Sequence, residues 1–292
     1  MSKENIKNYG KSIRSKLLNI AKEENVFYQT ILTRYFQERL LYRISQTRYR
    51  LNFYLKGGAL MYAYDRFAAR PTLDIDFLGN NISNDGSAII AAFKEICSVP
   101  CEEDGVAFDV ENITAQNITE FKDYHGVRLS IPVSMDTIAQ VMTMDIGFGD
   151  VVTPKPIDLD YPILLEHLPS ANILAYSIET VIAEKLHAVV DLADQSSRMK
   201  DYYDLYTILS KGQYDSSILQ EAIVHTFENR HTPFDENTMF FRKEFADNQQ
   251  MQVRWQAFVK KITKDTDRTF ADVATFIQEK LRPYWQNIPH EQ

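Results

Sequence analysis

Two aspartates inside an apolar stretch, Asp74 and Asp76 of "TLDIDFLG", have the spacing of a pair that could bind a metal ion. In a strand, side chains two positions apart project from the same face, so these carboxylates would lie together. Leu73, Ile75 and Phe77 would pack on the opposite face, in the core. Two neighbouring carboxylates repel each other, and a divalent cation such as Mg²⁺ is the simplest counter-charge. The pattern favours a phosphoryl- or nucleotidyl-transfer site, with an acidic solvent face of an edge strand as the alternative.

Two glycines precede this pair, at the point where a predicted strand passes into a predicted helix in "LKGGALMYAYDRF". Because Gly57 and Gly58 have no Cβ, backbone N–H groups at the helix N-terminus can approach an anion such as a phosphate. Arg70 lies four residues before Asp74 and could bind a phosphate in a bidentate manner. The nucleotide-binding candidates in this region are Lys56, Gly57, Gly58, Arg70 and Thr72.

A third carboxylate, Asp145 of "VMTMDIGFGD", lies in another apolar segment, with Met144 and Ile146 on the opposite face of the expected strand. The sequence around it offers no evident basic partner, which is uncommon for a carboxylate in a buried strand. If Asp145 converges with Asp74 and Asp76, one or two Mg²⁺ ions would explain all three as metal ligands. Asp145 is then also the candidate that accepts the proton of an attacking hydroxyl.

The segment 39–64 contains no acidic residue and is rich in arginine. A phosphate-facing surface near the glycine turn would explain this composition, and a solvated helix face is the alternative. An RNA bound to such a surface would show a strong salt dependence. The arginines concerned are Arg39, Arg43, Arg48 and Arg50.

The elements that position these residues fall into two halves. Periodicity predicts helices over 3–23 and 25–47, followed by the strand, helix and strand that carry the glycines and aspartates. Over 105–149 the pattern favours neighbouring antiparallel strands, and the proline-marked stretch 153–172 is expected to leave that sheet. Beyond Tyr176 every periodic segment predicts a helix.

This order predicts an α+β domain over residues 1–165 and an all-helical domain over 166–292, with a site expected in the cleft between them. A net charge of −8 argues against a protein that coats nucleic acid in general. Because there is no run of about 18 apolar residues and the N-terminus is polar, we expect a cytoplasmic protein with no membrane partner. Cys97 and Cys101 are expected to be free thiols.

The glycine pair, the Asp-x-Asp strand and the later strand aspartate resemble the signature of the nucleotidyltransferase superfamily related to DNA polymerase beta. More narrowly, the stretches 55–77 and 176–209 resemble the AbiEii/AbiGii toxin family. The second stretch follows its pattern Glu-x-x-x-Ala-x-Lys and then Arg-x-Lys-Asp-x-x-Asp-Leu. The resemblance implies a polymerase-beta-like mixed sheet with flanking helices, followed by an all-helical C-terminal domain. Many relatives have Thr or Ser where this chain has Ala59, so a hydroxyl contact to the phosphates is missing.

The resemblance also implies Mg²⁺-dependent transfer of a nucleotide from an NTP to RNA, in particular a tRNA end. Such an enzyme would be the toxin of a toxin–antitoxin or abortive-infection system for phage defence, with an antitoxin encoded nearby. By match of motif, Lys185 would contact the triphosphate, Arg198, Lys200 and Asp201 would line the other side of the cleft, and Asp204 is a further candidate. A solvated lysine and a first-turn helix acid are the structural alternatives for Lys185 and Asp201.

Two other functions remain open at this point. The acceptor could be a small molecule or a protein hydroxyl instead of RNA, since the donor site would be the same. A non-catalytic module that binds a nucleotide or a partner would bind Mg²⁺-NTP without turnover.

Overall fold

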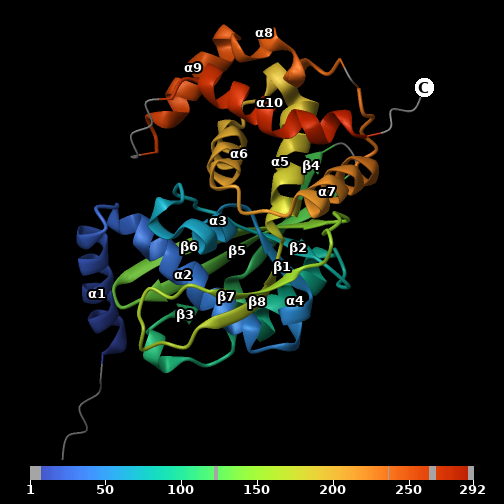
Figure 1. Ribbon diagram of the computed structural model, residues 1–292. Coiled ribbons are helices and arrows are strands. Elements are labelled where there is room, and N and C mark those ends of the chain that lie inside the picture. Colours follow the sequence, from blue (N-terminus) through green and yellow to red (C-terminus); the bar gives the residue numbers. More distant parts are fainter. Residues whose placement is uncertain (1–7, 122–123, 236, 263–267, 289–292) are drawn as a thin grey trace, which may run out of the picture. The chain divides into compact units, whose positions relative to one another are not determined.

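The computed structural model describes residues 8–121, 124–235, 237–262 and 268–288. The chain divides into two compact units, and each is described by itself (Figure 1). The first unit comprises Met1–Gly149 and Ile157–Ala175, and the second comprises Asp150–Pro156 and Tyr176–Gln292.

A mixed sheet forms the centre of the first unit, and within the described residues it has eight strands in the order β3-β5-β6-β2-β1-β8-β7, with β4 paired to β5. β1 runs antiparallel to β2 and parallel to β8, and β2 runs parallel to β6. This mixed sheet confirms the expected fold class. The strands are β1 (Phe53–Lys56), β2 (Ile75–Gly79), β3 (Ala107–Phe108), β4 (Thr114–Phe121), β5 (Tyr124–Met135), β6 (Ile138–Phe148), β7 (Ile157–Tyr161) and β8 (Ala171–Ala175).

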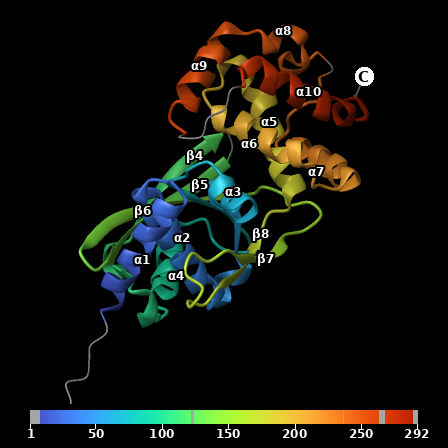
Figure 2. The same cartoon turned by 60° about the vertical axis from the view of Figure 1, so that its left-hand side comes forward.

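Helices cover this sheet (Figures 1 and 2). They are α1 (Tyr9–Glu23), α2 (Tyr28–Ser45), α3 (Gly57–Asp65) and α4 (Gly86–Cys97), and α2 contacts α1, α4 and β8. Phe53 of β1, Phe77 of β2 and Phe93 of α4 form an aromatic cluster, with ring centroids 5.0 Å apart for Phe53 and Phe93. Burial of these large apolar rings holds α4 and the two central strands together.

Several sequence predictions for this unit need correction. β4 was not predicted, because Gln116, Asn117 and Thr119 make its sequence polar. The stretch 153–172 does not leave the sheet, since it contains β7 and the first two residues of β8. Of the helix expected over 3–23, the structure has Tyr9–Glu23 with Asn8 as its N-cap, and residues 3–7 lie outside the described residues.

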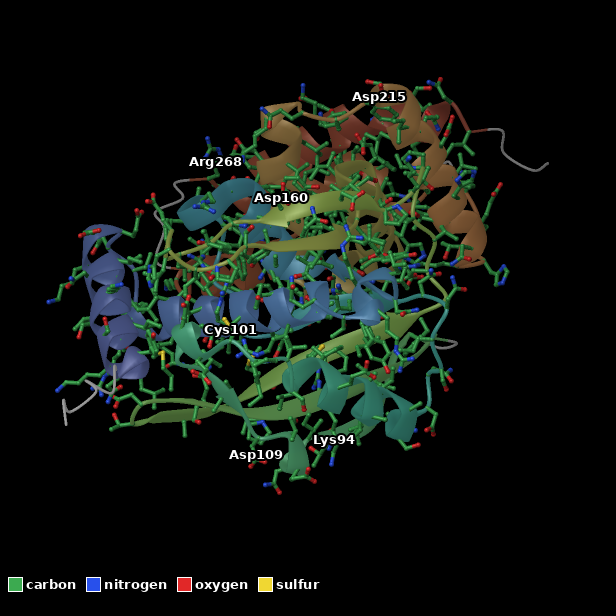
Figure 3. The ribbon with its side chains drawn as sticks, turned by 90° about the horizontal axis from the view of Figure 1, so that it is seen from below. Lys94, Cys101, Asp109, Asp160, Asp215 and Arg268 are labelled. Atoms are coloured by element: carbon green, nitrogen blue, oxygen red, sulfur yellow. The ribbon has the colours of Figure 1, made fainter. Side chains whose placement is uncertain are left out.

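The expected division of the chain into two domains after residue 165 stays a prediction. In the structure, residues 166–175 lie in the first unit and include β8, whose Ala175 is the register partner of Leu55 in β1. Both cysteines are free thiols, as predicted, with Cys97 buried at the end of α4 and Cys101 partly exposed in the loop that follows (Figure 3).

Within the described residues, the regular secondary structure of the second unit is helical, as expected. It contains α5 (Ile178–Leu192), α6 (Met199–Lys211), α7 (Ser216–Asn229), α8 (Lys243–Ala246), α9 (Gln249–Val259) and α10 (Phe270–Gln286). Local sequence sets the helix starts: the side chains of Ser177 and Asp215 cap α5 and α7, and Thr269 with Asp272 forms a capping box on α10. None of the helices that the structure describes combines the length and the apolar composition needed to cross a membrane.

Short 3-10 turns connect several of these elements. Their bounds are η1 (Arg48–Leu51), η2 (Arg66–Ala68), η3 (Glu102–Asp104), η4 (Val110–Asn112), η5 (Ala193–Gln195) and η6 (Met239–Phe241).

Candidate active site

Charged residues lie in register across the middle of the sheet. Lys56 of β1 pairs with Asp76 of β2, Asp76 pairs with Asp145 of β6, and Asp145 pairs with Arg128 of β5. Register partners on neighbouring strands project from the same face, and neighbouring strands are about 4.8 Å apart. The side chains therefore form one row, which we call the charge row, with two carboxylates at its centre and a cation at each end.

Asp74 joins this group from outside the strand. β2 begins at Ile75, so Asp74 lies in the bend just before it, and the prediction that both aspartates belong to the strand is wrong for Asp74. Ile75 and Phe77 are buried as predicted, whereas Leu73 does not pack in the core, because 73% of its surface is exposed. Leu73 and Asp74 precede β2, so the alternation of side chains that holds within the strand does not apply to them.

Arg128 is the site residue that the sequence analysis missed. Its Nε donates to Oδ1 of Asp145 at 2.7 Å and its Nη2 donates to Oδ2 at 2.6 Å, so the carboxylate has a bidentate basic partner. The pKa of the Arg128 guanidinium is raised, first by the hydrogen bond to Asp145 and its charge, and further by the charges of Asp74 and Asp76. All three carboxylates therefore act on one guanidinium.

A sequence signal for Arg128 did exist. The turn between β5 and β6 consists of Asp136 and Thr137, and counting outward from the pair Met135 and Ile138 places Arg128 opposite Asp145. The sequence predicted antiparallel neighbours here, but not the two-residue length of the turn, because the turn lacks the Asn-Gly or Asp-Gly sequence that such hairpins prefer. Asp136 does adopt a positive φ of 53°.

The glycine pair lets the start of α3 approach the aspartates. Gly57 has a φ of +66°, and a Cβ there would overlap Oδ2 of Asp76. A Cβ on Gly58 would lie 2.6 Å from Oγ1 of Thr72, whose hydroxyl donates to the carbonyl oxygen of Asp74 at 3.2 Å. The structure thus brings Gly57, Gly58 and Thr72 against the two aspartates, while phosphate binding by these residues stays a prediction.

Arg70 lies in the same loop and is half-buried. Its Nη1 is 3.5 Å from the carbonyl oxygen of Pro71, at the limit of a hydrogen bond. Arg70 thus lies in the loop that leads to Asp74, and its contact with a phosphate stays a prediction.

Buried side chains of α2 hold the loop that precedes β2. Nη2 of Arg34 donates to the carbonyl of Ala69 at 3.3 Å. Nε2 of Gln37 donates to the carbonyls of Leu73 and Asp74, both at 3.3 Å. Sequence analysis missed both residues, because a glutamine or arginine on a helix is normally exposed.

Gln37→Leu is expected to lower the rate of nucleotide transfer about tenfold or more, since small displacements of reacting groups are costly. The substitution removes both donors to the loop that carries Asp74, and the initial rate of NTP incorporation would be measured. Gln29→Leu is the matched control, because Gln29 lies on the same helix but is exposed, and its amide nitrogen donates to Gln140 at 2.8 Å, away from this loop. Equal rates for the two variants would contradict a positioning role for Gln37.

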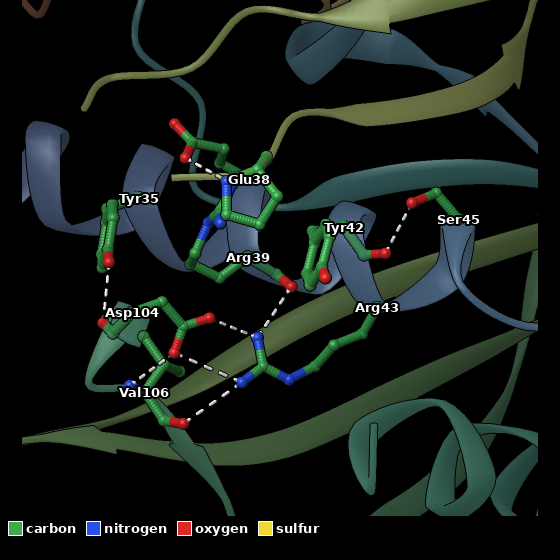
Figure 4. Close-up of polar contacts among 9 residues, drawn as sticks. Tyr35, Glu38, Arg39, Tyr42, Arg43, Ser45, Asp104 and Val106 are labelled. Carbon is green, nitrogen blue, oxygen red and sulfur yellow. Dashed lines mark hydrogen bonds and ion pairs between the residues drawn. The ribbon is translucent and has the colours of Figure 1, made fainter. Parts of the chain in front are cut away.

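The arginine-rich segment does not provide the expected basic surface. Arg39 is 0% exposed and pairs with Glu38 at 2.8 Å. Arg43 is also buried, and its guanidinium donates to Asp104 at 2.7 Å (Figure 4). Both the phosphate-facing surface and the solvated helix face are therefore wrong for Arg39 and Arg43.

The remaining two arginines of that segment are partly or fully exposed and have acidic partners. Arg48 pairs with Glu95 at 3.0 Å, and Arg50 pairs with Asp158. These acidic residues come from α4 and β7, outside the segment 39–64, so the charge of the segment is compensated from elsewhere in the fold.

A second polar cluster lies in the second unit and contains most of the motif residues of the helical half. Nζ of Lys185 on α5 contacts Asp201 at 3.1 Å and Asp204 at 2.7 Å on α6. Nε of Arg198 donates to the other oxygen of Asp201 at 2.7 Å, whereas Lys200 is exposed. Burial alone would raise the pKa of Asp201, but the charges of Lys185 and Arg198 outweigh it and lower the pKa.

This cluster excludes the solvated lysine as an explanation of Lys185, because only 11% of its side chain is exposed. Asp201 does lie in the first turn of α6, as its alternative proposed, and is buried as well. Asp201 and Asp204 share a helix face because they are three residues apart. A contact of Lys185 with a triphosphate stays a prediction.

Lys185→Met is expected to lower the free energy of unfolding by about 2 kcal/mol, because two buried carboxylates would lose a shared cation. Asp201 keeps Arg198, which limits the loss. Urea denaturation would measure it, and Asp204→Asn in the same chain should restore part of the stability by removing one of the opposed charges. If Lys185→Met alone were as stable as the unchanged protein, the ion pairs would not hold α5 to α6.

The aspartates of the first unit fit a divalent cation only in part. Carboxylate oxygens are the ligands that Mg²⁺ takes, and Asp74 and Asp76 lie two residues apart at the start of β2. Both oxygens of Asp145, however, accept hydrogen bonds from Arg128. No three His, Cys, Asp or Glu side chains in the described part of the chain are arranged to hold a metal ion. The structure thus does not present the three aspartates as an assembled ligand set, and their metal roles stay predictions.

Comparison with solved structures supports the fold class described above. A protein from H. pylori described as a proposed nucleotidyltransferase has a crystal structure that covers 89% of this chain and 96% of its own, with a TM-score of 0.51 and 14% identity. The crystal structure of JHP933 from Helicobacter pylori covers 85% and 88%, with a TM-score of 0.49 and 15% identity. At these identities the first likeness concerns the fold alone.

No curated protein sequence matches the chain significantly. The family model described as nucleotidyl transferase AbiEii toxin of a type IV toxin–antitoxin system matches residues 39–280. That range includes the charge row as well as the Lys185 cluster, and it confirms the resemblance found in the sequence. The chain belongs to the AbiEii family of nucleotidyl transferase toxins.

Proposed function

We propose that this toxin transfers a nucleoside monophosphate from an NTP to a hydroxyl of RNA, in particular at a tRNA end, with the help of Mg²⁺. The single observation that carries the proposal is the charge row with Gly57 against Asp76. It combines carboxylates for a cation, flanking cations and the N-terminus of α3 as a site for phosphate.

Each residue has a proposed role in that reaction. Asp74, Asp76 and Asp145 would hold the cation, which when bound would neutralise charge on the phosphates and the leaving pyrophosphate. Lys56 and Arg70 would bind phosphate oxygens, together with the backbone at Gly57. These roles follow from charge and from position, in the charge row for Lys56 and Asp76 and in the loop before β2 for Arg70 and Asp74.

Asp145 would accept the proton of the attacking hydroxyl, once an oxygen of its carboxylate is free to do so. Lys185 would contact the triphosphate from the second unit, with Arg198, Lys200 and Asp201 as further contributors. For these four residues the proposal rests on the family motif. Lys185, Arg198 and Asp201 also contact one another in the cluster, whereas Lys200 is exposed.

The RNA acceptor rests on the family alone. The arginine surface that would have favoured RNA over other acceptors is absent at Arg39 and Arg43, which are buried. A small molecule or a protein hydroxyl therefore remains the second candidate acceptor. The cytoplasmic location and an antitoxin encoded nearby belong to the same proposal.

Labelling tests the proposal directly. The protein would be incubated with Mg²⁺, total RNA and each labelled NTP in turn, and mass spectrometry of the RNA would identify the added base and its position. We expect labelled RNA, and no labelling by an Asp74→Ala/Asp76→Ala variant. Equal labelling by that variant would refute the site, and label on protein or a small molecule would refute the RNA acceptor. Binding of Mg²⁺-NTP without any product would indicate a non-catalytic module.

A further inference from the structure

The bidentate pair between Arg128 and Asp145 is the feature of the charge row that a metal-dependent reaction does not explain. Both carboxylate oxygens of Asp145 are engaged, at 2.7 and 2.6 Å, and the carboxylate is largely buried. A planar guanidinium matches a carboxylate with two parallel hydrogen bonds, so this geometry is a strong and directional one. A cation that used Asp145 as a ligand would need the same oxygens.

The charges on the face of the sheet that carries the charge row give a second reason why Arg128 opposes cation binding. Within the charge row, Lys56 and Arg128 balance Asp76 and Asp145, and Asp74 adds one negative charge. A divalent cation is attracted more strongly by a face with one positive charge fewer. Arg128 thus opposes cation binding twice, through its charge and through its hydrogen bonds.

Exposure separates the two partners of this pair. The side chain of Arg128 is 42% exposed, whereas that of Asp145 is 12% exposed. The guanidinium can therefore leave for solvent, while the carboxylate stays at its place in the sheet. Water would hydrate the released guanidinium, and the bound cation would replace it as the positive partner of Asp145.

We propose that Arg128 is a positioning residue that competes with the divalent cation for Asp145, an inference that rests on the proposed function. Without a cation, Arg128 keeps the crowded carboxylates from repelling one another and holds Asp145 in place. When the cation binds, Arg128 must release Asp145. The ion pair therefore sets the cation concentration at which the site is occupied.

Mn²⁺ binding to the full chain without NTP tests this competition, with free Mn²⁺ measured by electron paramagnetic resonance. Removal of one charged competitor with two hydrogen bonds should tighten binding about tenfold in Arg128→Ala. Arg128→Lys keeps the charge but not the bidentate geometry, and it should bind Mn²⁺ with intermediate affinity. This second variant keeps the test valid if the alanine variant fails to fold.

Arg14→Ala is the matched control. Arg14 has a similar exposure of 46% and donates to an aspartate of the same unit, Asp136, at 3.3 Å, outside the charge row. We expect its affinity for Mn²⁺ to equal that of the unchanged protein. Tightening of the same size in Arg14→Ala would refute a specific effect of Arg128.

Asp145→Asn separates competition for the carboxylate from a general effect of charge. If Arg128 and the cation compete for Asp145, the tightening caused by Arg128→Ala should be clearly smaller in the Asp145→Asn background, where only the effect of the Arg128 charge is left. Tightening of full size in that background would overturn the inference, as would unchanged or weaker binding in Arg128→Ala.

Asp76→Asn distinguishes failure of this inference from failure of the proposed function. If Asp76→Asn abolishes Mn²⁺ binding but Arg128→Ala leaves it unchanged, the competition is refuted and the cation site stands. If the unchanged protein binds no Mn²⁺, or binds it independently of Asp76, the cation site and the inference both fail.

Discussion

Asp76→Asn is expected to abolish nucleotide transfer without unfolding the protein. Asp76 lies between Lys56 and Asp145 in the charge row, and its carboxylate packs against Gly57. Asparagine has nearly the same shape but lacks the charge that would hold a cation. The loss of a group that stabilises charge in a transition state should lower the rate by a factor on the order of 10³.

The rate of incorporation of labelled NTP would measure this effect, and thermal unfolding would report on the fold. We expect an unchanged or slightly higher melting temperature, because the substitution removes one of several like charges. Asp136→Asn is the control: Asp136 lies in the turn after β5 with a positive φ, which asparagine tolerates, and its rate should stay the same. A rate for Asp76→Asn within tenfold of the unchanged protein would show that Asp76 does not act in the reaction.

Arg43→Met is expected to lower the free energy of unfolding by about 3–5 kcal/mol, the usual loss when one partner of a buried ion pair is removed. Asp104 is 0% exposed and accepts two hydrogen bonds from Arg43, at 2.7 and 3.4 Å. Its Oδ1 also accepts from the backbone N–H of Val106 at 2.9 Å, so the carboxylate cannot turn towards water (Figure 4). Without the guanidinium, the charge would remain buried with neutral donors, the N–H of Val106 and the thiol of Cys101.

Urea denaturation followed by circular dichroism would measure this loss. Arg48→Met is the matched control, because Arg48 belongs to the same arginine-rich segment but its pair with Glu95 is exposed. We expect that control to lie within about 0.5 kcal/mol of the unchanged protein. A loss below about 1 kcal/mol for Arg43→Met would mean that Asp104 is solvated or protonated without Arg43.

Patterns that depend on near neighbours in the chain were predictable. The alternation of Ile75, Asp76 and Phe77 identified a strand with one polar and one apolar face, and the structure has that strand. Gly57 and Gly58 marked the passage from β1 to α3, because only residues without a Cβ fit there. Helices of the second unit followed from their period and their capping residues.

Features that depend on distant partners were not predictable in the same way. Arg39 and Arg43 look like surface residues in any local pattern, since an isolated charged side chain is rarely buried. Their burial requires Glu38 and Asp104, and Asp104 is sixty-one residues beyond Arg43 in the chain. β7 and β8 were missed because prolines surround them. The pairing of β7 with β8 and of β8 with β1 decides their conformation.

The sequence by itself therefore determined the family and the type of fold, and it named most of the charged residues for which we propose a role in transfer. Only the tertiary structure decided that Asp76 and Asp145 are neighbours and that Arg128 holds Asp145. The physical reason is that strand order and register are set by packing and by hydrogen bonds between segments far apart in the chain. A spacing of two residues could place Asp74 near Asp76, but only the sheet could place Arg128 beside them.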